Sequence, residues 1–498
     1  MSLSASLDAA SITSAEDSSL SLFTKERAPV TLALALGVGS HAVNRFVTVA
    51  VLPDIIRDLG GQDQAFWLFA AFEMAAILSG FLTGAAKMRY GAKAPFLIAT
   101  LVLAAGSVIA GFSPVFWGLI VGKTLQGFGE GVVIAICYAL IPDVYPRRVA
   151  ARVFAVLSGI WAIAAAVGPV SAGLMTDLWS WRAAFLVNIP LTILLGTLIF
   201  VSIPGWSTSR HQQDQRQKER KKHSLFTRLT LLILCVLCLT AIGEVREPLM
   251  LFVTIGAGLF TAVLFLKADR SGGARLLPLE AFRPQTLIGL GTWIVLMISV
   301  TAAVRAIFVA TFGQVLWGLS VTEASYVAAL LAMSWTVFAW ISARAKNRTA
   351  EMVFMISGPI LIVLGLALAG LAVDTKSLWL FMTASIVNGA GHGVSSQIMT
   401  RSLMYGSKES ERDLVSAMLP SLSSAGAAVG GGLTGLLAIQ IGLISPANDG
   451  LVTYQAIENA GAILFYIMAA ITLIPAAAMF VLRTRILRQE GVILTRTP

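Results

Sequence analysis

Charged residues are scarce in this chain, at 12% of its 498 residues, against roughly 25% in soluble domains. Hydrophobic residues make up 57%, so most of the folded surface must face something other than water. The sequence also lacks the alternating ten-residue segments of a membrane β-barrel. Apolar runs of about 20 residues recur instead, and each can cross a ~30 Å hydrocarbon core as a helix. The composition predicts an all-α polytopic protein whose main partner is the lipid bilayer.

Cysteine is also rare, and Cys137, Cys235 and Cys238 all lie in apolar runs. Cys235 and Cys238 have the spacing of a redox pair, but without a strand–helix–strand context we interpret all three as core residues. The sequence has no Walker-type nucleotide loop and no zinc-ligand spacing. It therefore predicts no enzyme, no metal site and no cofactor.

The net charge of +10 would suit a nucleic-acid partner, but its distribution argues against one. The basic residues lie in short loops between apolar runs, which is typical of the cytoplasmic loops of membrane proteins. With both termini cytoplasmic, 29 of the 36 Lys and Arg fall in cytoplasmic segments and four in external loops. Residues 1–29 lack the pattern of a cleaved signal peptide. We expect a monomer in a bacterial inner membrane.

Fourteen apolar runs can be counted, in groups of six, two and six. They lie at about 30–52, 65–86, 94–112, 114–141, 152–175, 182–203, 226–243, 248–266, 285–311, 320–343, 350–373, 377–400, 414–440 and 459–482. The run at 226–243 is the weakest, because its uninterrupted apolar part is about 15 residues against the ~20 expected.

These runs predict two six-helix bundles joined through a two-helix insertion. The expected parts are a cytoplasmic tail (1–29), the first bundle (30–203), a basic cytoplasmic loop (204–225), the insertion (226–267), a cytoplasmic linker (268–284), the second bundle (285–482) and a cytoplasmic tail (483–498).

The two bundles share a repeat. Gln126 to Gly131 (QGFGEG) recurs as Asn388 to Gly393 (NGAGHG), at an offset of 262 residues (388 minus 126). Small residues on one helix face let neighbouring backbones approach closely in a bilayer. Two membrane-embedded halves built from a repeat indicate a secondary transporter.

Charged side chains inside the predicted spans form the candidate site, because each costs roughly 2.5–3.5 kcal/mol at mid-bilayer unless it pairs or faces water. We predict that Arg45 and Arg305 are paired anion ligands facing each other across a central cavity, because guanidinium groups bind carboxylate or phosphate in a bidentate manner. The alternative is that each arginine only neutralises Glu73 or Glu130 within its own half. The other predicted substrate-binding residues are Lys123, His41, Asn44, Gln126, Asn388 and His392.

Glu73 and Glu130 are the predicted proton carriers, since they are the acidic residues placed well inside spans. A buried carboxylate beside a cation can bind and release protons as its surroundings change. The alternative is that both form permanent salt bridges. His392 can relay protons or bind substrate, because imidazole titrates near physiological pH, or it can be a polar residue packed between glycines.

Four segments carry recognisable helix motifs, at residues 123–129, 168–173, 181–190 and 314–320. Through them the chain resembles the major facilitator superfamily, specifically its fourteen-span drug:proton antiporter group, over about residues 40–480. Residues 123–129 resemble the fourth-helix motif, with Lys123 in place of its usual arginine, and residues 168–173 resemble the fifth-helix antiporter motif. Residues 181–190 match the segment that follows, and residues 314–320 resemble the end of the first helix of the second half.

Two positions depart from the family pattern. Asn44 stands where the first-helix pattern has an aspartate, and Met88 stands where the loop after the second span has an acidic gating residue. The family's usual proton site is therefore missing. The resemblance still implies conformational roles for Gly84, Arg89, Gly91, Lys93, Gly168 and Pro169.

The sequence thus predicts a proton-coupled secondary transporter, driven by the proton-motive force and needing only a small-molecule substrate and protons as partners. We expect an exporter of an amphipathic organic anion that works by alternating access, with the direction implied by the resemblance. One alternative is a multidrug/proton antiporter for cationic or neutral lipophilic compounds. Another is a transporter-like membrane sensor.

Overall fold

The computed structural model describes residues 22, 24, 27–60, 65–203, 225–241, 248–271, 275–345, 347–444 and 452–494. Within these ranges the regular elements are all helices. The first bundle contains α2 (Ala28–Leu59), α3 (Ala65–Tyr90), α4 (Lys93–Phe112), α5 (Phe116–Val144), α6 (Arg147–Leu178), α7 (Ala183–Leu186) and α8 (Asn188–Ser202).

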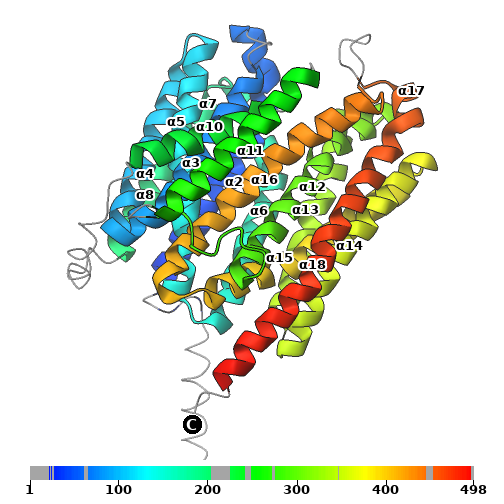
Figure 1. The fold of residues 1–498 in the computed structure, drawn as a ribbon. Coiled ribbons are helices and arrows are strands. Elements are labelled where there is room, and N and C mark those ends of the chain that lie inside the picture. Colours follow the sequence, from blue (N-terminus) through cyan, green and yellow to red (C-terminus); the bar gives the residue numbers. More distant parts are fainter. Residues whose placement is uncertain are drawn as a thin grey trace, which may run out of the picture.

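The remaining helices form the insertion and the second bundle. They are α10 (Leu225–Ala241), α11 (Pro248–Ser271), α12 (Leu287–Trp317), α13 (Val321–Ala343), α14 (Arg348–Asp374), α15 (Leu378–Gly406), η3 (Glu409–Glu411), α16 (Arg412–Gln440), α17 (Tyr454–Ala456), η5 (Ile457–Gly461) and α18 (Ala462–Leu494). Figure 1 shows the long helices running side by side across the molecule.

Eleven of the described helices are long and apolar enough to cross a membrane, so the chain is a multi-pass membrane protein. The helices α2, α10 and α15 are outside that set. With 17 residues, α10 is shorter than the ~20 needed for a span, at the run that the sequence marks as weakest. The count of fourteen spans stays a prediction.

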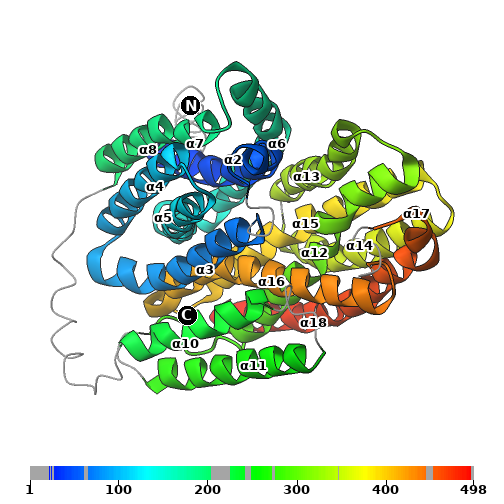
Figure 2. The ribbon, with the colours of Figure 1, turned by 90° about the horizontal axis from the view of Figure 1, so that it is seen from above.

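The helices divide into two groups, with α2 to α8 on one side and α12 to α18 on the other (Figure 2). The helices α10 and α11 lie beside each other at the edge of the molecule, where α10 contacts α3 and α16. The two groups meet along two seams: α16 packs against α3 and α5, and α6 packs against α13 and α15.

The glycine repeat brings equivalent helices together in both bundles. A Cβ atom on Gly131 of α5 would lie 2.2 Å from the carbonyl oxygen of Ala76 on α3. A Cβ atom on Gly393 of α15 would lie 2.4 Å from the carbonyl oxygen of Trp335 on α13. Both distances are far below van der Waals contact, so only glycine permits these helix crossings. The sequence repeat therefore corresponds to a repeated packing contact.

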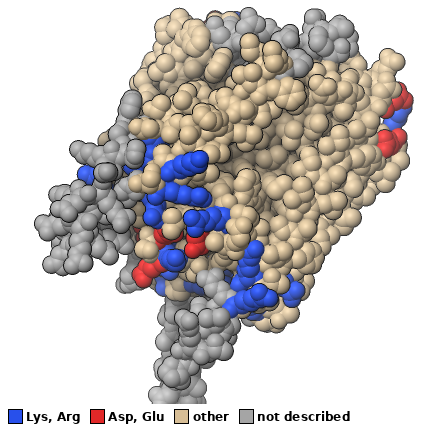
Figure 3. All heavy atoms as spheres, viewed as in Figure 1, with Lys and Arg blue, Asp and Glu red and all other residues tan. Residues whose placement is uncertain are grey.

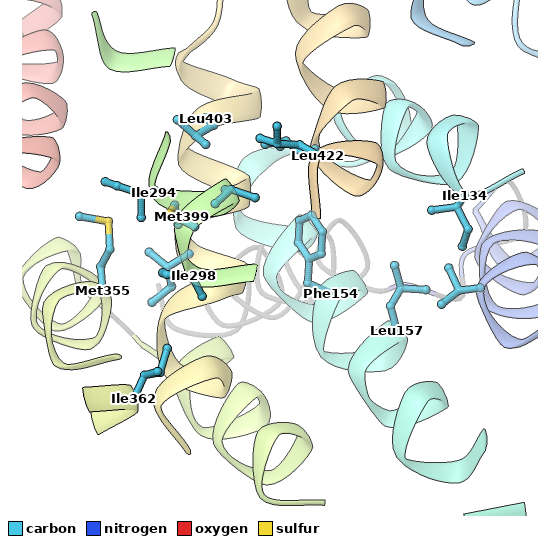
Figure 4. Close-up of a cluster of buried hydrophobic side chains, with 14 of the residues drawn as sticks. Ile134, Phe154, Leu157, Ile294, Ile298, Met355, Ile362, Met399, Leu403 and Leu422 are labelled. Carbon is cyan, nitrogen blue, oxygen red and sulfur yellow. The ribbon is translucent and has the colours of Figure 1, made fainter. Parts of the chain in front are cut away.

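Apolar side chains hold the two groups together. Phe154 and Leu157 of α6 belong to the same buried cluster as Met399 of α15 and Leu422 of α16, and Figure 4 shows these side chains in one region. The apolar core therefore continues across the seam between the bundles.

Charges are confined to parts of the surface. The face in Figure 3 is uncharged over a broad central region, while most of its Lys and Arg, with some acidic residues, gather toward one end and a few charged residues lie at the opposite edge. A wide uncharged band with charges near its edges is the surface expected of a protein whose middle faces lipid.

Candidate functional site

A cavity of about 460 Å³ lies between the two bundles. Its walls come from α2, α3, α5 and α6 on one side and from α12, α13, α15 and α16 on the other. This volume lies within the range of pockets that hold small molecules, roughly 300–1,000 Å³. Of the predicted site residues, His41, Arg45 and His392 line this cavity.

Each bundle contributes an imidazole–indole pair to the cavity wall. The ring of His41 meets Trp161 edge to face, with centroids 5.7 Å apart and an interplanar angle of 78°. The ring of His392 stacks on Trp335, with centroids 4.8 Å apart and an angle of 13°. All four residues line the cavity. Aromatic rings offer large, rigid apolar surfaces with polar tips, so this wall suits an amphipathic molecule with a planar apolar part.

Arg45 forms an ion pair at the cavity wall. Its Nη2 atom lies 3.0 Å from Oε1 of Glu73 on α3, and the two side chains are 40% and 21% exposed. This pair matches the alternative prediction, in which Arg45 neutralises an acidic residue of its own bundle. Oε2 of Glu73 is buried and has no hydrogen-bond partner among the described residues.

Behind this wall, a closed polar network joins α2 to α5. Glu130 is fully buried, with its Oε2 atom 2.7 Å from Nδ1 of His41 and its Oε1 atom 2.6 Å from Nδ2 of Asn44. Nζ of Lys123 donates to Oδ1 of Asn44 at 3.3 Å. The amide of Gln126 accepts from Asn44 at 3.3 Å. The predicted residues of the first bundle are thus brought together, and only His41 of this network lines the cavity.

The network also extends to two hydroxyl groups. Nζ of Lys123 donates to Oγ1 of Thr48 at 3.0 Å, and Nε2 of Gln126 donates to Oγ of Ser107 at 2.9 Å. The ammonium of Lys123 lies 4.3 Å from the centre of the Phe72 ring, a cation–π contact. Lys123 is therefore held by several weak contacts rather than by a direct carboxylate.

Arg305 has a different setting in the second bundle. It is 4% exposed, and its Nη2 atom donates to Oγ of Ser385 on α15 at 2.8 Å. Its Nε and Nη1 atoms are buried without a hydrogen-bond partner among the described residues. Arg305 does not line the cavity, although Ala302, one turn earlier on α12, does. The two arginines do not face each other across a shared space in this conformation.

The buried cations of the two bundles lie at related helix crossings. Lys123 and Ser385 are 262 residues apart (385 minus 123), as required by the repeat. In the first bundle the cation is on α5 and contacts Asn44 of α2, whereas in the second it is Arg305 of α12 and contacts Ser385 of α15. In both bundles the first helix therefore contacts the fourth at this point. The cation is on the fourth helix in the first bundle and on the first helix in the second bundle.

This exchange leaves the interior of the second bundle positively charged. In the first bundle, Arg45 and Lys123 are balanced by Glu73 and Glu130. In the described middle parts of α12, α13, α14, α15, α16 and α18, Arg305 has no acidic counterpart. An uncompensated buried cation is costly unless an anion approaches it.

The remaining predicted ligand, Asn388, lies outside the cavity wall. Its Nδ2 atom donates to the carbonyl of Ile362 on α14 at 3.2 Å. The helices cross closely at this point, because a Cβ atom on Gly365 would lie 2.7 Å from Cβ of Asn388. Asn388 thus joins two helices of the second bundle.

The predicted conformational residues occupy several places. Gly84 lies at the α3–α16 seam, where an added Cβ would be 3.0 Å from Cα of Leu414. Arg89 lies over the ring of Tyr90, at 5.2 Å. Gly91 has a positive φ of 74° between α3 and α4.

The other predicted conformational residues are Lys93, Gly168 and Pro169. Nζ of Lys93 donates to the carbonyl of Phe200 on α8 at 2.7 Å and lies 4.5 Å from the centre of that ring. In α6, the carbonyl of Gly168 accepts a hydrogen bond from Ser171 at 2.9 Å. The side chain of Pro169 lies outside the described part of the chain.

The sequence did not predict an ion-paired contact that joins the two bundles. Nζ of Lys87 on α3 lies 2.5 Å from Oδ1 of Asp413 on α16 and 2.6 Å from Oδ2 of Asp143 on α5. The hydroxyl of Tyr405 donates to the carbonyl of Tyr145 in the same inter-bundle region. The one available signal was a lysine, next to Met88, at the end of a predicted span.

Comparisons with known proteins agree with this architecture. The family model for the Major Facilitator Superfamily matches residues 34–375, and the chain belongs to that superfamily. A protein of Mycobacterium tuberculosis named "Probable multidrug-efflux transporter" is 27% identical over 459 residues, covering 87% of this chain and 93% of the relative. Multidrug resistance protein 3 of Bacillus subtilis is 22% identical over 380 residues, covering 75% and 72%. The chain is therefore a membrane transporter with efflux relatives, and not an enzyme.

Two solved structures share the fold. The human organic anion transporter MFSD10 (TETRAN) has a TM-score of 0.67 at 13% identity, covering 92% of this chain and 100% of that one. The proton:xylose symporter XylE has a TM-score of 0.63 at 13% identity, covering 91% and 94%. At this level of identity both structures bear on the fold alone.

Proposed function

We propose that this protein is a proton-coupled exporter of amphipathic organic anions, belonging to the fourteen-span drug:proton antiporter group. The observation that carries the anion preference is the uncompensated charge of Arg305 beside an otherwise balanced interior. Arg305 does not line the cavity, so its charge would act through the protein interior, where the effective dielectric is far below that of water and one net positive charge favours anions over cations.

The cavity supports the amphipathic part of the proposal. Trp161 and Trp335 give it rigid apolar walls on both sides, while His41, Arg45 and His392 supply polar contacts. A planar apolar body would pack between the indoles, and its acidic group would lie toward Arg305 and His392. Glu73 and Glu130 would carry the coupling protons, because each carboxylate has a cation nearby, Arg45 in direct contact and Lys123 through Asn44.

A second candidate function is a multidrug/proton antiporter for cationic or neutral lipophilic compounds. The printed names of the Mycobacterium tuberculosis and Bacillus subtilis relatives favour it. The Arg45–Glu73 pair also supports it, because a cationic compound in the cavity could replace Arg45 as the partner of Glu73. The two functions differ in the sign of the preferred charge. A membrane sensor has no supporting feature in the described residues.

Transport of two matched probes would decide between them. Naphthalene-2-sulfonate and trimethyl-(2-naphthyl)ammonium share one aromatic body and differ in the sign of the charge. In proteoliposomes with an acidic lumen, proton efflux should drive uptake of the sulfonate. Uptake of the ammonium alone would favour the second function, and uptake that ignores the pH gradient would exclude proton coupling.

A further inference from the structure

Glu130 is sealed from water, so any proton that it binds must arrive through a neighbouring side chain. Its exposure is 0%, and it does not line the cavity. A buried carboxylate that exchanges protons therefore needs a hydrogen-bonded neighbour that itself borders water.

Two side chains hydrogen-bond to this carboxylate, and one of them can pass a proton on. Nδ2 of Asn44 donates to Oε1 at 2.6 Å, but a side-chain amide does not titrate and so only donates. Nδ1 of His41 lies 2.7 Å from Oε2. An imidazole gains and loses protons near neutral pH, and it has two separate ring nitrogens with which to do so.

His41 also borders the cavity. It is a lining residue, and its second ring nitrogen, Nε2, makes no hydrogen bond to a described residue. The ring is held between two aromatic neighbours, Phe72 with centroids 6.3 Å away and Trp161 at 5.7 Å. One nitrogen therefore engages Glu130, while the other is left for cavity water.

We propose that His41 is the proton relay between the cavity and Glu130, an inference that rests on the proposed proton coupling. A hydronium ion in the cavity gives a proton to Nε2 and becomes water. Nδ1 then passes its proton to Oε2 of Glu130, which becomes a carboxylic acid. The imidazole ends neutral, with its proton on Nε2. Release of the proton follows the same steps in reverse.

Several titratable and charged groups surround the His41–Glu130 pair. They are Arg45 on α2, Glu73 on α3, Lys123 and Tyr138 on α5, and His392 on α15 across the cavity. Arg45 is itself paired with Glu73 at 3.0 Å. Lys123 is linked to Glu130 through Asn44.

Time-resolved infrared spectroscopy of the full-length protein in lipid nanodiscs tests the relay without any cargo. After a pH step from alkaline to acidic, subtracting the E130Q spectrum from the wild-type spectrum should leave the carboxylic-acid band of Glu130, because Glu73 and the other carboxylates contribute to both spectra. In H41Q the band should reach its full amplitude but appear at least tenfold more slowly, since glutamine can bond to Glu130 but cannot pass a proton on. Y138F, which changes a different titratable side chain of the cavity wall, should keep the wild-type rate.

A wild-type rate in H41Q, or the absence of any difference band between the wild type and E130Q, would overturn the relay. If H41Q does not fold, H41A with added free imidazole is the second route. The protonation rate should then rise with imidazole concentration, and a rate independent of imidazole would count against the proposal. Since no cargo is present, failure of anion transport would leave this result standing.

Discussion

Lys87 of α3 and Asp413 of α16 form an ion pair that joins the two bundles, with Nζ 2.5 Å from Oδ1. The same ammonium donates to the carbonyl of Ala139 on α5 at 2.9 Å and lies 2.6 Å from Asp143. One cation thus connects three helices, and alternating access requires the bundles to separate at this seam. In the proposed alternating access, the pair would stabilise one of the two end states.

Removing this cation should destabilise the conformation described above. The side chains of Lys87 and Asp413 are 5% and 12% exposed, and removing one partner of a buried pair costs about 3–5 kcal/mol. We expect K87A to lower the melting temperature in detergent. The melting temperature of the double variant K87A/D413N should fall by less than the sum of the falls in K87A and D413N.

The matched control is the Lys376–Glu458 pair, which has an Nζ–Oε1 distance of 2.6 Å but side chains that are 45% and 46% exposed. K376A should leave the melting temperature almost unchanged, because exposed pairs contribute little. Strictly additive losses at Lys87 and Asp413 would show that the inter-bundle pair has no energetic coupling.

The helix crossing at Gly131 should tolerate no side chain. A Cβ there would meet the backbone of α3 at 2.2 Å, so G131A must push α3 and α5 apart, at roughly 1–3 kcal/mol or more. Gly173 of α6 has open space around it, and G173A should be neutral or stabilise by up to about 1 kcal/mol. Melting temperatures of the two variants would test this, and equal values would contradict the packing account.

Arg305 should be a residue that lowers stability. Its Nε and Nη1 atoms are buried without partners among the described residues, and replacing such a charge by an apolar side chain often stabilises a protein. R305M is therefore expected to raise the melting temperature. R45M, which removes the partner of Glu73, should not. A clear fall in the melting temperature of R305M would show that the arginine has a compensating partner.

The Arg45–Glu73 pair should control anion affinity in two directions. E73Q leaves the guanidinium of Arg45 uncompensated at the cavity wall, so naphthalene-2-sulfonate should bind several-fold more tightly. R45M should weaken binding by a similar factor. Fluorescence titration of both purified variants would measure the change, and a shift of the same sign in both would refute the electrostatic explanation.

The fold was open to prediction because a bilayer imposes few solutions. Backbone groups in hydrocarbon must bond internally, so apolar runs of about 20 residues specify helices. The glycine repeat also had a direct structural meaning, since Gly131 and Gly393 occur at equivalent crossings. The short helix α10 shows the limit, because composition alone does not determine whether 17 residues cross a membrane.

Side-chain directions at the site were harder to predict. Arg45 and Arg305 are 260 residues apart, whereas the repeat has an offset of 262, so Arg305 corresponds to Val43. A difference of two residues turns a side chain by about 200° around a helix of 3.6 residues per turn. The sequence predicted a similar depth for both arginines, but because of this rotation one side chain lies at the cavity and the other lies inside its bundle.

Contacts between distant residues left no trace in the sequence. Lys87 and Asp413 are 326 residues apart, and no local pattern links them. Likewise, nothing in the order of residues shows that His41 bonds to Glu130, because the contact depends on how α2 and α5 cross. Such pairs become visible only when the bundles are assembled.

The most direct test of an anion-selective interior is to measure, by calorimetry, the equilibrium binding of the matched naphthalene probes to the purified protein. The wild type should bind naphthalene-2-sulfonate at least tenfold more tightly than trimethyl-(2-naphthyl)ammonium, and R305M should lose that preference while still folding. Equal preference in the wild type and R305M, or a preference for the ammonium in the wild type, would contradict the account.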